Sequence, residues 1–400
     1  MKICKTIAIN FILLFFFLGL LSAGPSMLKM LYRAINPKVA APLGFSEEIR
    51  KNYPWYDMHE KELQEVGTGY KDFIVMQHRP FTGKTINVDK NGVRYTKPSA
   101  IESNGNRYLF FGASLIWGYG ATDDLTIPSI FSHINQAVSC NYGVLSAGVR
   151  QLLALLTNYY IENKIKGDKK NIIIFNNGIM TALKLLHSNK IELSTIYQDM
   201  IQDALAIPLP LSPAFFLEPA SQVVLKIKSE FKSSNEAKPR FDGFYEEAIE
   251  FTAEITVRSW LAAQSLSSTF GDDFFAVLPP TSVTGHPYLE HLPRVCTEEE
   301  ATFIRSVCKR IIAKIKEHPE IKFIDLTHIF DGDEPIYIDR FHYSPKGNRI
   351  YAEALTKQIN AFTIRDASKR TKTHTPRKNE SKRPYGATNP TVQEGLTYVR

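Results

Sequence analysis

The chain has 400 residues, of which 44% are hydrophobic and 12% aromatic, and this is ordinary usage for a globular protein with a large core. Its formal net charge is +7, but residues 365–400 alone carry nine basic residues against three acidic ones. The rest of the chain is therefore close to neutral, and we expect no nucleic-acid partner. Length and composition exclude a fibrous or wholly disordered protein and predict one or two domains with tails.

Residues 1–25 predict a secretory signal or a membrane anchor. Lys2 and Lys5 precede a long apolar run, as in both kinds of segment. Leu21 stands where a cleavage site needs a small residue, and Pro25 disfavours a cut just before it, so the pattern favours an uncleaved anchor. With the two lysines inside, the rest of the chain is expected to face the periplasm or the cell exterior. Cleavage would instead make the protein secreted.

Residues 26–103 form an N-terminal extension that is rich in proline, tyrosine and charged residues. The extension lacks the sustained periodicity of a second core. Strand-like runs within residues 79–98 flank Asn91-Gly92, a dipeptide that favours a tight hairpin turn.

An apolar run with aromatic residues, Tyr108 to Phe111, predicts a buried strand that ends at Gly112, just before Ser114. Small neighbours let the chain turn sharply from a strand into a helix while the serine oxygen stays exposed to a substrate. This pattern indicates a nucleophile at the carboxyl end of a parallel strand. Taken alone, the stretch fits an ordinary turn serine equally well.

Helix and strand patterns then alternate, which predicts a three-layer α/β/α domain with a central parallel sheet in residues 104–363. Residues 189–242 interrupt the alternation with five prolines, and they predict either an insertion over the site or ordinary core packing of an apolar patch. The predicted helices are 127–138, 149–162, 179–187, 243–268, 297–316 and 344–361; the later predicted strands are 139–144, 170–175, 273–278 and 321–326.

Three cysteines, Cys140, Cys296 and Cys308, follow the N-terminal apolar run. A predicted helix would separate Cys296 from Cys308 by about 18 Å at a rise of 1.5 Å per residue, which exceeds the reach of a disulfide. We therefore expect buried thiols. Histidine and cysteine do not cluster with metal-ligand spacing, and no phosphate or dinucleotide fingerprint occurs, so we predict no metal and no cofactor.

Asp339 and His342 stand three residues apart, directly before the last predicted helix. A serine hydroxyl becomes nucleophilic at neutral pH when an imidazole accepts its proton, and a carboxylate fixes the tautomer of that imidazole. One short loop can supply both partners to a serine. Asp325 and His328 have the same spacing, but no helix-opening Ser-Pro follows His328, so we assign that pair a structural role.

Residues 364–400 form a basic tail rich in serine, threonine, proline and asparagine. Such composition is typical of disorder. We favour a solvated tail over one that binds an anionic polymer or lipid head groups.

These elements together resemble the SGNH (GDSL-like) hydrolase family over residues 108–362. The resemblance rests on the strand-end serine and on the run Asp339-x-x-His342-x-Ser344-Pro345-x-Gly347-Asn348. It implies a flavodoxin-like three-layer fold, Ser114 as nucleophile, His342 as general base and acid, and Asp339 as the residue that orients the imidazole.

The family's two remaining blocks depart from the usual pattern. The oxyanion residue, usually glycine, falls at Ser146, which can still donate its backbone N–H, and Gly148 is a nearby substitute. In the next block, Met180 stands where the resemblance implies an asparagine amide, and methionine cannot donate a hydrogen bond. We expect Asn177, or otherwise Asn176, to compensate.

The resemblance implies an enzyme that cleaves or transfers esters through an acyl-serine. The Asn-Val-Asp and Gly-x-Arg pattern within residues 87–94 also resembles exported bacterial members associated with surface polysaccharides. Our hypothesis is a membrane-tethered esterase or O-acyltransferase that acts on an ester of a cell-envelope glycan or lipid. Because Met180 removes one donor, a catalytically impaired relative that binds glycan or assists its assembly is the alternative.

Overall fold

The computed structural model describes residues 51–97, 107–163, 170–177, 179–188, 245–293 and 295–373. The predicted anchor at residues 1–25, the insertion at residues 189–242 and residues 374–400 lie outside these ranges. Within them, no helix combines the length and the apolar character needed to cross a membrane. The chain divides into two compact units, Met1–Gln358 and Ile359–Arg400.

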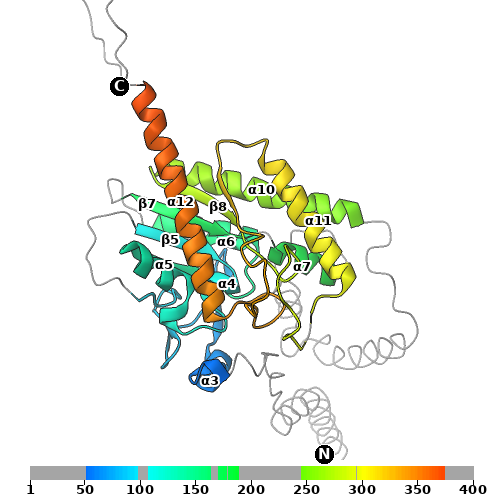
Figure 1. Cartoon of the computed structure of the whole chain (residues 1–400). Coiled ribbons are helices and arrows are strands. Elements are labelled where there is room, and N and C mark those ends of the chain that lie inside the picture. The colour runs from blue at the N-terminus through cyan, green and yellow to red at the C-terminus, as the bar shows by residue number, and fades with distance from the viewer. Residues whose placement is uncertain are drawn as a thin grey trace, which may run out of the picture. The chain divides into compact units, whose positions relative to one another are not determined.

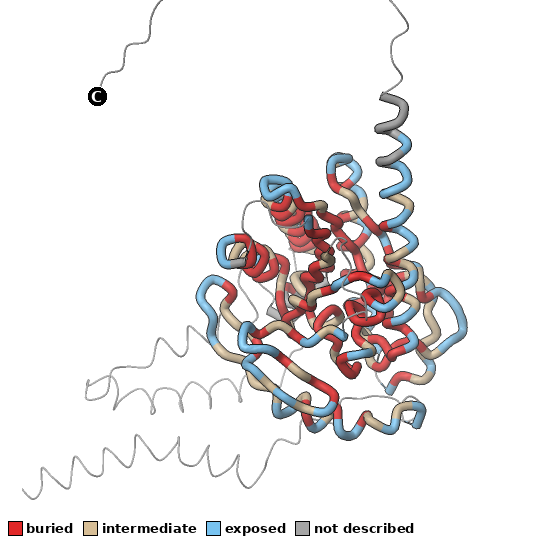
Figure 2. Tube along the Cα trace, turned by 90° about the vertical axis from the view of Figure 1, so that its left-hand side faces the viewer, coloured by how far each residue is buried: buried red, intermediate tan, exposed pale blue. Residues whose placement is uncertain are grey.

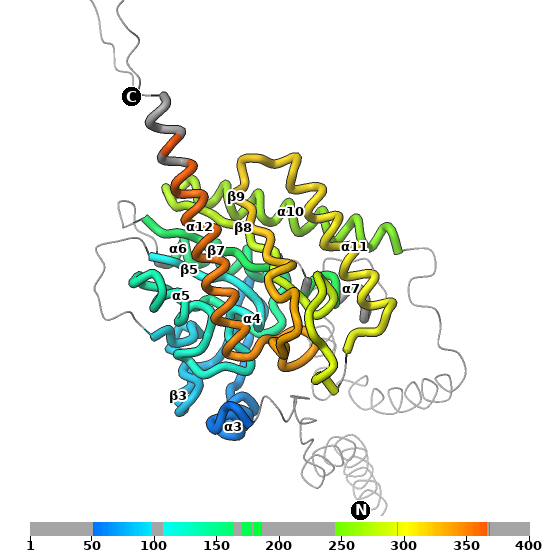
Figure 3. Tube along the Cα trace, viewed as in Figure 1, coloured from blue at the N-terminus to red at the C-terminus, as the bar shows by residue number. Residues whose placement is uncertain are grey.

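Five parallel strands form the central sheet, and this confirms the predicted three-layer α/β/α fold. The strands lie in the order β6-β5-β7-β8-β9, so that β6 and β9 are the edge strands and β5, β7 and β8 are interior. Figures 1 and 3 show the three interior strands side by side. Their bounds are β5 (Arg107–Gly112), β6 (Val138–Gly143), β7 (Asn171–Asn176), β8 (Asp273–Leu278) and β9 (Lys322–Asp325).

Helices cover both faces of this sheet because alternate strand residues point to opposite sides. Phe111 and Phe175 pack into the large core under α6, α10 and α11, whereas Phe110 contacts Phe131 of α5 on the other face. Buried residues concentrate in the strands and on the inner sides of these helices (Figure 2). The helix bounds are α4 (Ser114–Trp117), α5 (Ile127–Asn135), α6 (Val149–Asn163), α7 (Ile179–Ser188), α10 (Tyr245–Thr269), α11 (Glu298–Ile315) and α12 (Pro345–Thr373).

Helix α12 is longer than the predicted helix 344–361, so the first residues of the predicted tail are helical. No glycine or proline occurs between Gly347 and Pro376, and nothing in the sequence therefore ends the helix earlier. None of the three described cysteines forms a disulfide; Cys308 is buried as expected, whereas Cys140 and Cys296 are only half-buried.

The described part of the extension, residues 51–97, is called the N-terminal segment below. It contains α3 (Tyr56–Glu65), a hairpin of β1 (Thr68–Lys71) and β2 (Val75–His78), and a second pair of β3 (Phe81–Thr82) and β4 (Asn87–Val88). The predicted turn at Asn91-Gly92 is confirmed, because Gly92 adopts φ 74° and Val88 bridges Arg94 across it. Helix α3 was not predicted because its buried face includes His59 and Glu62, which interrupt the apolar pattern.

Two buried histidines hold this segment in place. His78 stacks on Trp117 with ring centroids 4.8 Å apart, and its Nε2 accepts the N–H of Leu145 at 3.2 Å. Burial and the charge of Arg94 lower the pKa of His78 to about 4. For the same two reasons the pKa of His59 falls to about 3, although Glu62 opposes the shift. Both side chains are therefore neutral in the folded protein at neutral pH.

These histidines predict an acid-labile fold. A histidine whose pKa is lower in the folded state binds its proton first in the unfolded state, so stability falls as pH decreases from about 6.5 towards the folded-state value. His78→Gln keeps a hydrogen-bond acceptor but cannot be protonated. Between pH 7 and pH 4.5 we expect the free energy of unfolding of this variant to fall by roughly 2 kcal/mol less than that of the wild-type protein. Urea unfolding at the two pH values measures this difference. The exposed His133→Gln is the matched control, and an equal acid loss in both variants would contradict the prediction.

Candidate active site

The sheet register places the candidate groups at one edge. Gly112, the last residue of β5, pairs with Gly143 of β6 and with Asn176 of β7. The carboxyl ends of parallel strands meet at the same edge, which is where open α/β sheets bind their ligands. Ser114 lies two residues beyond Gly112, and Ser146 lies three residues beyond Gly143.

Close packing fixes the turn on which Ser114 begins the short helix α4. A Cβ at Gly112 would lie 2.3 Å from Ile116 Cγ1, and one at Gly143 would lie 2.2 Å from the backbone nitrogen of Trp117. Both glycines are therefore required for α4 to approach the strands so closely. The structure thus explains the small residues from which the nucleophile was predicted.

Ser114, His342 and Asp339 form a continuous chain of hydrogen bonds. His342 Nε2 lies 2.7 Å from Ser114 Oγ, and His342 Nδ1 lies 2.7 Å from Asp339 Oδ2. The geometry is that of a nucleophile, a base within proton-transfer reach, and a carboxylate that selects the tautomer protonated at Nδ1. The structure therefore brings together the three residues that the sequence singled out.

The carboxylate of Asp339 is held as an anion. Its Oδ1 accepts the backbone N–H groups of Phe341 at 2.7 Å and His342 at 2.8 Å. Burial by itself would raise the pKa of Asp339, but the charge of His342 and these hydrogen bonds outweigh it and hold the pKa below its usual range. An ionised Asp339 can stabilise the imidazolium that forms when His342 takes a proton.

Three contacts fix the loop that carries Asp339 and His342. The N–H of Ile338 donates to the carbonyl of His342 at 2.9 Å, and Ser282 Oγ donates to the carbonyl of Arg340 at 2.7 Å. Arg340 also pairs with the buried Glu300 at 3.2 Å. The ring of Tyr119 lies against the imidazole, with centroids 4.2 Å apart. The imidazole is therefore restrained by its neighbours as well as by Asp339.

The Ser-Pro-x-Gly-Asn run after His342 has a structural explanation. Ser344 Oγ accepts the N–H of Gly347 at 3.3 Å at the start of α12, and Asn348 Nδ2 donates to the carbonyl of Leu125 at 2.9 Å. A Cβ at Gly347 would lie 2.6 Å from Ile336 Cγ2. This run attaches the base-bearing loop to the helix that follows it.

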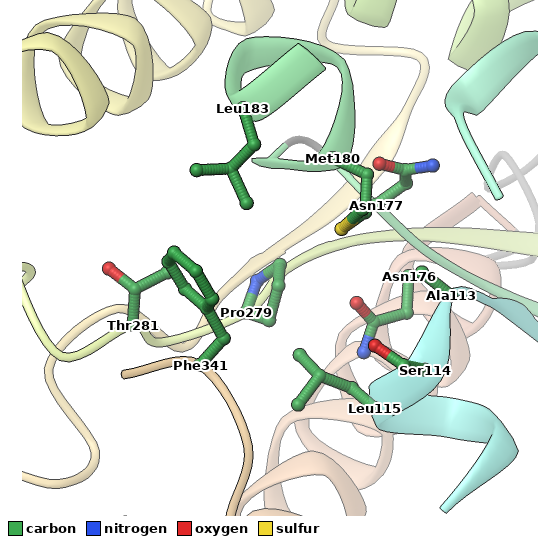
Figure 4. Close-up of a pocket in the computed structure, with 10 residues that line it drawn as sticks. All are labelled: Ala113, Ser114, Leu115, Asn176, Asn177, Met180, Leu183, Pro279, Thr281 and Phe341. Atoms are coloured by element: carbon green, nitrogen blue, oxygen red, sulfur yellow. The ribbon is translucent and has the colours of Figure 1, made fainter. Parts of the chain in front are cut away.

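A mainly apolar pocket opens beside Ser114 (Figure 4). Met180 points its sulfur into this pocket from α7, opposite Leu115 of α4. Two lining residues were not predicted from the sequence: Pro279, which directly follows β8, and Phe341, which directly precedes His342. The full lining is Ala113, Ser114, Leu115, Asn176, Asn177, Met180, Leu183, Pro279, Thr281 and Phe341.

Ser146 adopts a left-handed backbone conformation, with φ 60°, which glycine adopts most readily. This left-handed conformation is rare for residues other than glycine, asparagine and aspartate. The loop therefore keeps a glycine-like shape despite the substitution. Donation of the Ser146 N–H to an oxyanion stays a prediction that is compatible with this shape.

The other predicted oxyanion residues are placed less favourably. The N–H of Gly148 already donates to Gln151 Oε1 at 3.0 Å, so it is engaged within its own loop. The amide of Asn177 points away from Ser114 in Figure 4, whereas Asn176 Nδ2 donates to Tyr351 Oη at 2.5 Å. A compensating role for Asn177 stays a prediction, and it requires the side chain to turn.

The second Asp-x-x-His pair is not assembled as a catalytic pair, as predicted. His328 is exposed, and its Nδ1 lies 3.1 Å from Asp331 Oδ2. Asp325 Oδ1 instead accepts the N–H and hydroxyl of Thr327, at 2.9 and 2.6 Å. Identical spacing therefore produces a hydrogen-bonded Asp–His pair at only one of the two places.

No protein-family model matches the chain, and no curated protein matches it either. Solved structures do match. A lipolytic protein of the G-D-S-L family from Desulfitobacterium hafniense is 12% identical, with a TM-score of 0.36 over 64% of this chain and 99% of that one. A carbohydrate acetylesterase family member from Sinorhizobium meliloti is 11% identical, with a TM-score of 0.31 over 64% and 98%. An aryl esterase from M. smegmatis is 13% identical, with a TM-score of 0.35 over 64% and 99%.

The conformation of Ser146 yields a stability prediction. Ser146→Gly removes the cost of a left-handed serine, which is about 1 kcal/mol, partly offset by the greater freedom of glycine in the unfolded chain. We expect the glycine variant to show a small rise in the free energy of unfolding. Ser146→Val should lower the free energy of unfolding by at least about 1 kcal/mol, because a branched Cβ fits this conformation worst. Chemical denaturation of the three proteins tests the order. A valine variant as stable as the glycine variant would contradict the left-handed conformation.

Proposed function

We propose that this SGNH-type chain is a serine esterase that works through an acyl-serine intermediate. The observation that supports the proposal is the chain of two 2.7 Å hydrogen bonds from Ser114 through His342 to Asp339. A serine with only a structural role does not require a hydrogen-bonded imidazole and an ionised carboxylate behind that imidazole. The apolar pocket beside Ser114 offers a place for the acyl part of an ester.

In the proposed reaction, Ser114 Oγ attacks the carbonyl carbon of the ester while His342 Nε2 takes its proton. Asp339 stabilises the imidazolium, and the backbone near Ser146 supports the oxyanion. Collapse of the tetrahedral intermediate releases the alcohol, which receives the proton from His342. Water or an acceptor hydroxyl, deprotonated by His342, then releases the acyl group from Ser114.

For the substrate, we propose an ester of a cell-envelope glycan or lipid, with the chain held at the membrane through residues 1–25. The basic, apolar N-terminus and the pattern at residues 87–94 support this setting. Hydrolysis and O-acyl transfer share the acyl-serine, so both activities are compatible with the site. A glycan-binding protein with impaired catalysis is the second candidate, because Met180 occupies the place of an amide donor.

The first test is covalent labelling of Ser114. An organophosphonate probe traps an activated serine oxygen, so we expect the wild-type protein to be labelled and Ser114→Ala to be inert. His342→Ala should label nearly as poorly because the oxygen loses its base. Asp339→Asn should lose up to about 10⁴-fold in rate through the wrong tautomer. Intact-protein mass spectrometry measures the labelled fraction against time.

His328→Ala is the matched control for the histidine variant, since His328 is exposed and pairs with Asp331. It should label at the wild-type rate. A folded wild-type protein that resists the probe would remove the enzyme proposal and favour the glycan-binding candidate.

The second test concerns the missing amide. If the lack of a donor at Met180 limits turnover, Met180→Asn should raise the hydrolysis of an activated acetyl ester, by up to about 100-fold. Met180→Leu keeps an apolar wall without a donor and should give no such rise. Steady-state kcat values of both variants decide the question. Equal values would show that the amide is not limiting.

A further inference from the structure

Arg94, in the N-terminal segment, is buried against the turn that carries the nucleophile. Its side chain is 0% exposed and lies over the ring of Trp117, 4.4 Å from the centroid. Nη1 donates to the carbonyls of Trp117 at 2.8 Å and Gly118 at 2.7 Å, and Nη2 donates to the carbonyl of Ala121 at 2.7 Å. One guanidinium thus binds the carbonyl of the last residue of α4 and two carbonyls just beyond this helix.

The last carbonyls of a helix have no partner within the helix, and the last two residues of α4, Ile116 and Trp117, are buried. Residues 114–121 are called the nucleophile turn below. Gly118 turns the chain there with φ 93°, and a Cβ at this position would lie 2.4 Å from Thr126 Cγ2 and 3.0 Å from Arg94 Nη1. The turn is therefore shaped around the guanidinium. A planar guanidinium places donors on three separate nitrogens in a fixed fork, so it can bind carbonyls and a carboxylate on different sides at once, whereas the donors of an ammonium all share one nitrogen.

Arg94 is itself fixed at both ends. Its backbone N–H donates to the carbonyl of Asn141 in β6 at 3.2 Å, and its Nε donates to Asp123 Oδ1 at 3.0 Å. Asn87 Nδ2 holds the other oxygen of Asp123 at 2.8 Å. A buried charge needs a partner and full hydrogen bonding, and Arg94 has both. These contacts hold the guanidinium in one position, and its hydrogen bonds in turn fix the positions of the carbonyls that it binds.

The same segment also contacts the loop that follows β6. His78 accepts the N–H of Leu145, next to Ser146, and the carbonyl of Ile74 accepts Gln151 Nε2 at 3.1 Å. Two chain stretches flank the reacting atoms: the nucleophile turn and the loop at Ser146. The N-terminal segment holds both of them through side chains that are buried and aimed at the backbone.

We infer that the N-terminal segment is part of the catalytic apparatus, with Arg94 as a positioning residue for Ser114 and His78 as a positioning residue for the loop at Ser146. Neither side chain touches the reacting atoms. They act by fixing the backbone segments that carry or border the reacting atoms, because a displacement of about 1 Å can cost 100-fold in rate. The inference rests on the proposed serine chemistry for its kinetic effect, but not for its structural effect.

The test compares Arg94→Lys with the wild-type protein. Lysine keeps the positive charge, but its single nitrogen cannot occupy the separate positions from which Nε, Nη1 and Nη2 bind Asp123 and the three carbonyls, so we expect phosphonate labelling of Ser114 to slow about 10- to 100-fold. Hydrogen–deuterium exchange should rise in peptides covering residues 113–121 and not in β8. The pH midpoint of labelling should keep its wild-type value because Arg94 does not contact the His342–Asp339 pair.

Tyr160→Phe is the stability control, since it removes a buried hydrogen bond to Asp272 at the far end of β7. The inference is overturned if Arg94→Lys labels and exchanges like Tyr160→Phe at an equal loss of melting temperature.

If the wild-type protein resists the probe, the proposed function fails, and the exchange data alone decide the inference. If Arg94→Lys does not fold, the pair His78→Phe and His78→Gln decides it. Glutamine keeps the acceptor for Leu145 and should label faster than phenylalanine, and equal rates overturn the inference.

Discussion

The register of the parallel sheet is the constraint on which the site depends. Gly112, Gly143 and Asn176 lie side by side at the ends of β5, β6 and β7, so the segments that leave these strands emerge within a few ångströms of one another. A shift of one residue in any strand would turn its core side chains to the wrong face and would separate Ser114 from the loop at Ser146. Core packing and site assembly are therefore set by the same backbone pairing.

Charge is the second constraint, because three ionisable groups of the site and of the N-terminal segment are buried or half-buried. Asp339 and Glu62 accept backbone N–H groups, and both have a pKa below the usual range although burial opposes it. Arg94 donates to backbone carbonyls instead. In each case the charge is stabilised by peptide groups that it also holds in place. The same hydrogen bonds therefore stabilise these charges and fix the backbone around them.

The sheet, its helices and the triad were predictable because each has a local signal. The apolar run before Ser114 marks a buried strand, and Asp339 and His342 stand in one short loop. What the sequence did not reveal depends on contacts between distant residues. Helix α3 buries His59 and Glu62, whose partners lie more than twenty residues away in the loop between β3 and β4. The hydrogen bond from the Gly148 N–H to Gln151 is different, because it joins residues only three apart and is a local contact that the sequence analysis missed.

The place of Arg94 in the chain separates two boundaries that are often treated as one. By its strands and helices, the domain begins at β5, and a protein shortened to start at residue 104 would keep every strand of the central sheet. It would nevertheless lack the guanidinium that donates to the buried carbonyls of Trp117, Gly118 and Ala121 in the whole chain. The boundary given by the strands and helices and the boundary needed to hold the nucleophile turn therefore fall at different residues. Ribosomal synthesis makes the N-terminal segment first, so the guanidinium is already available when the nucleophile turn is formed.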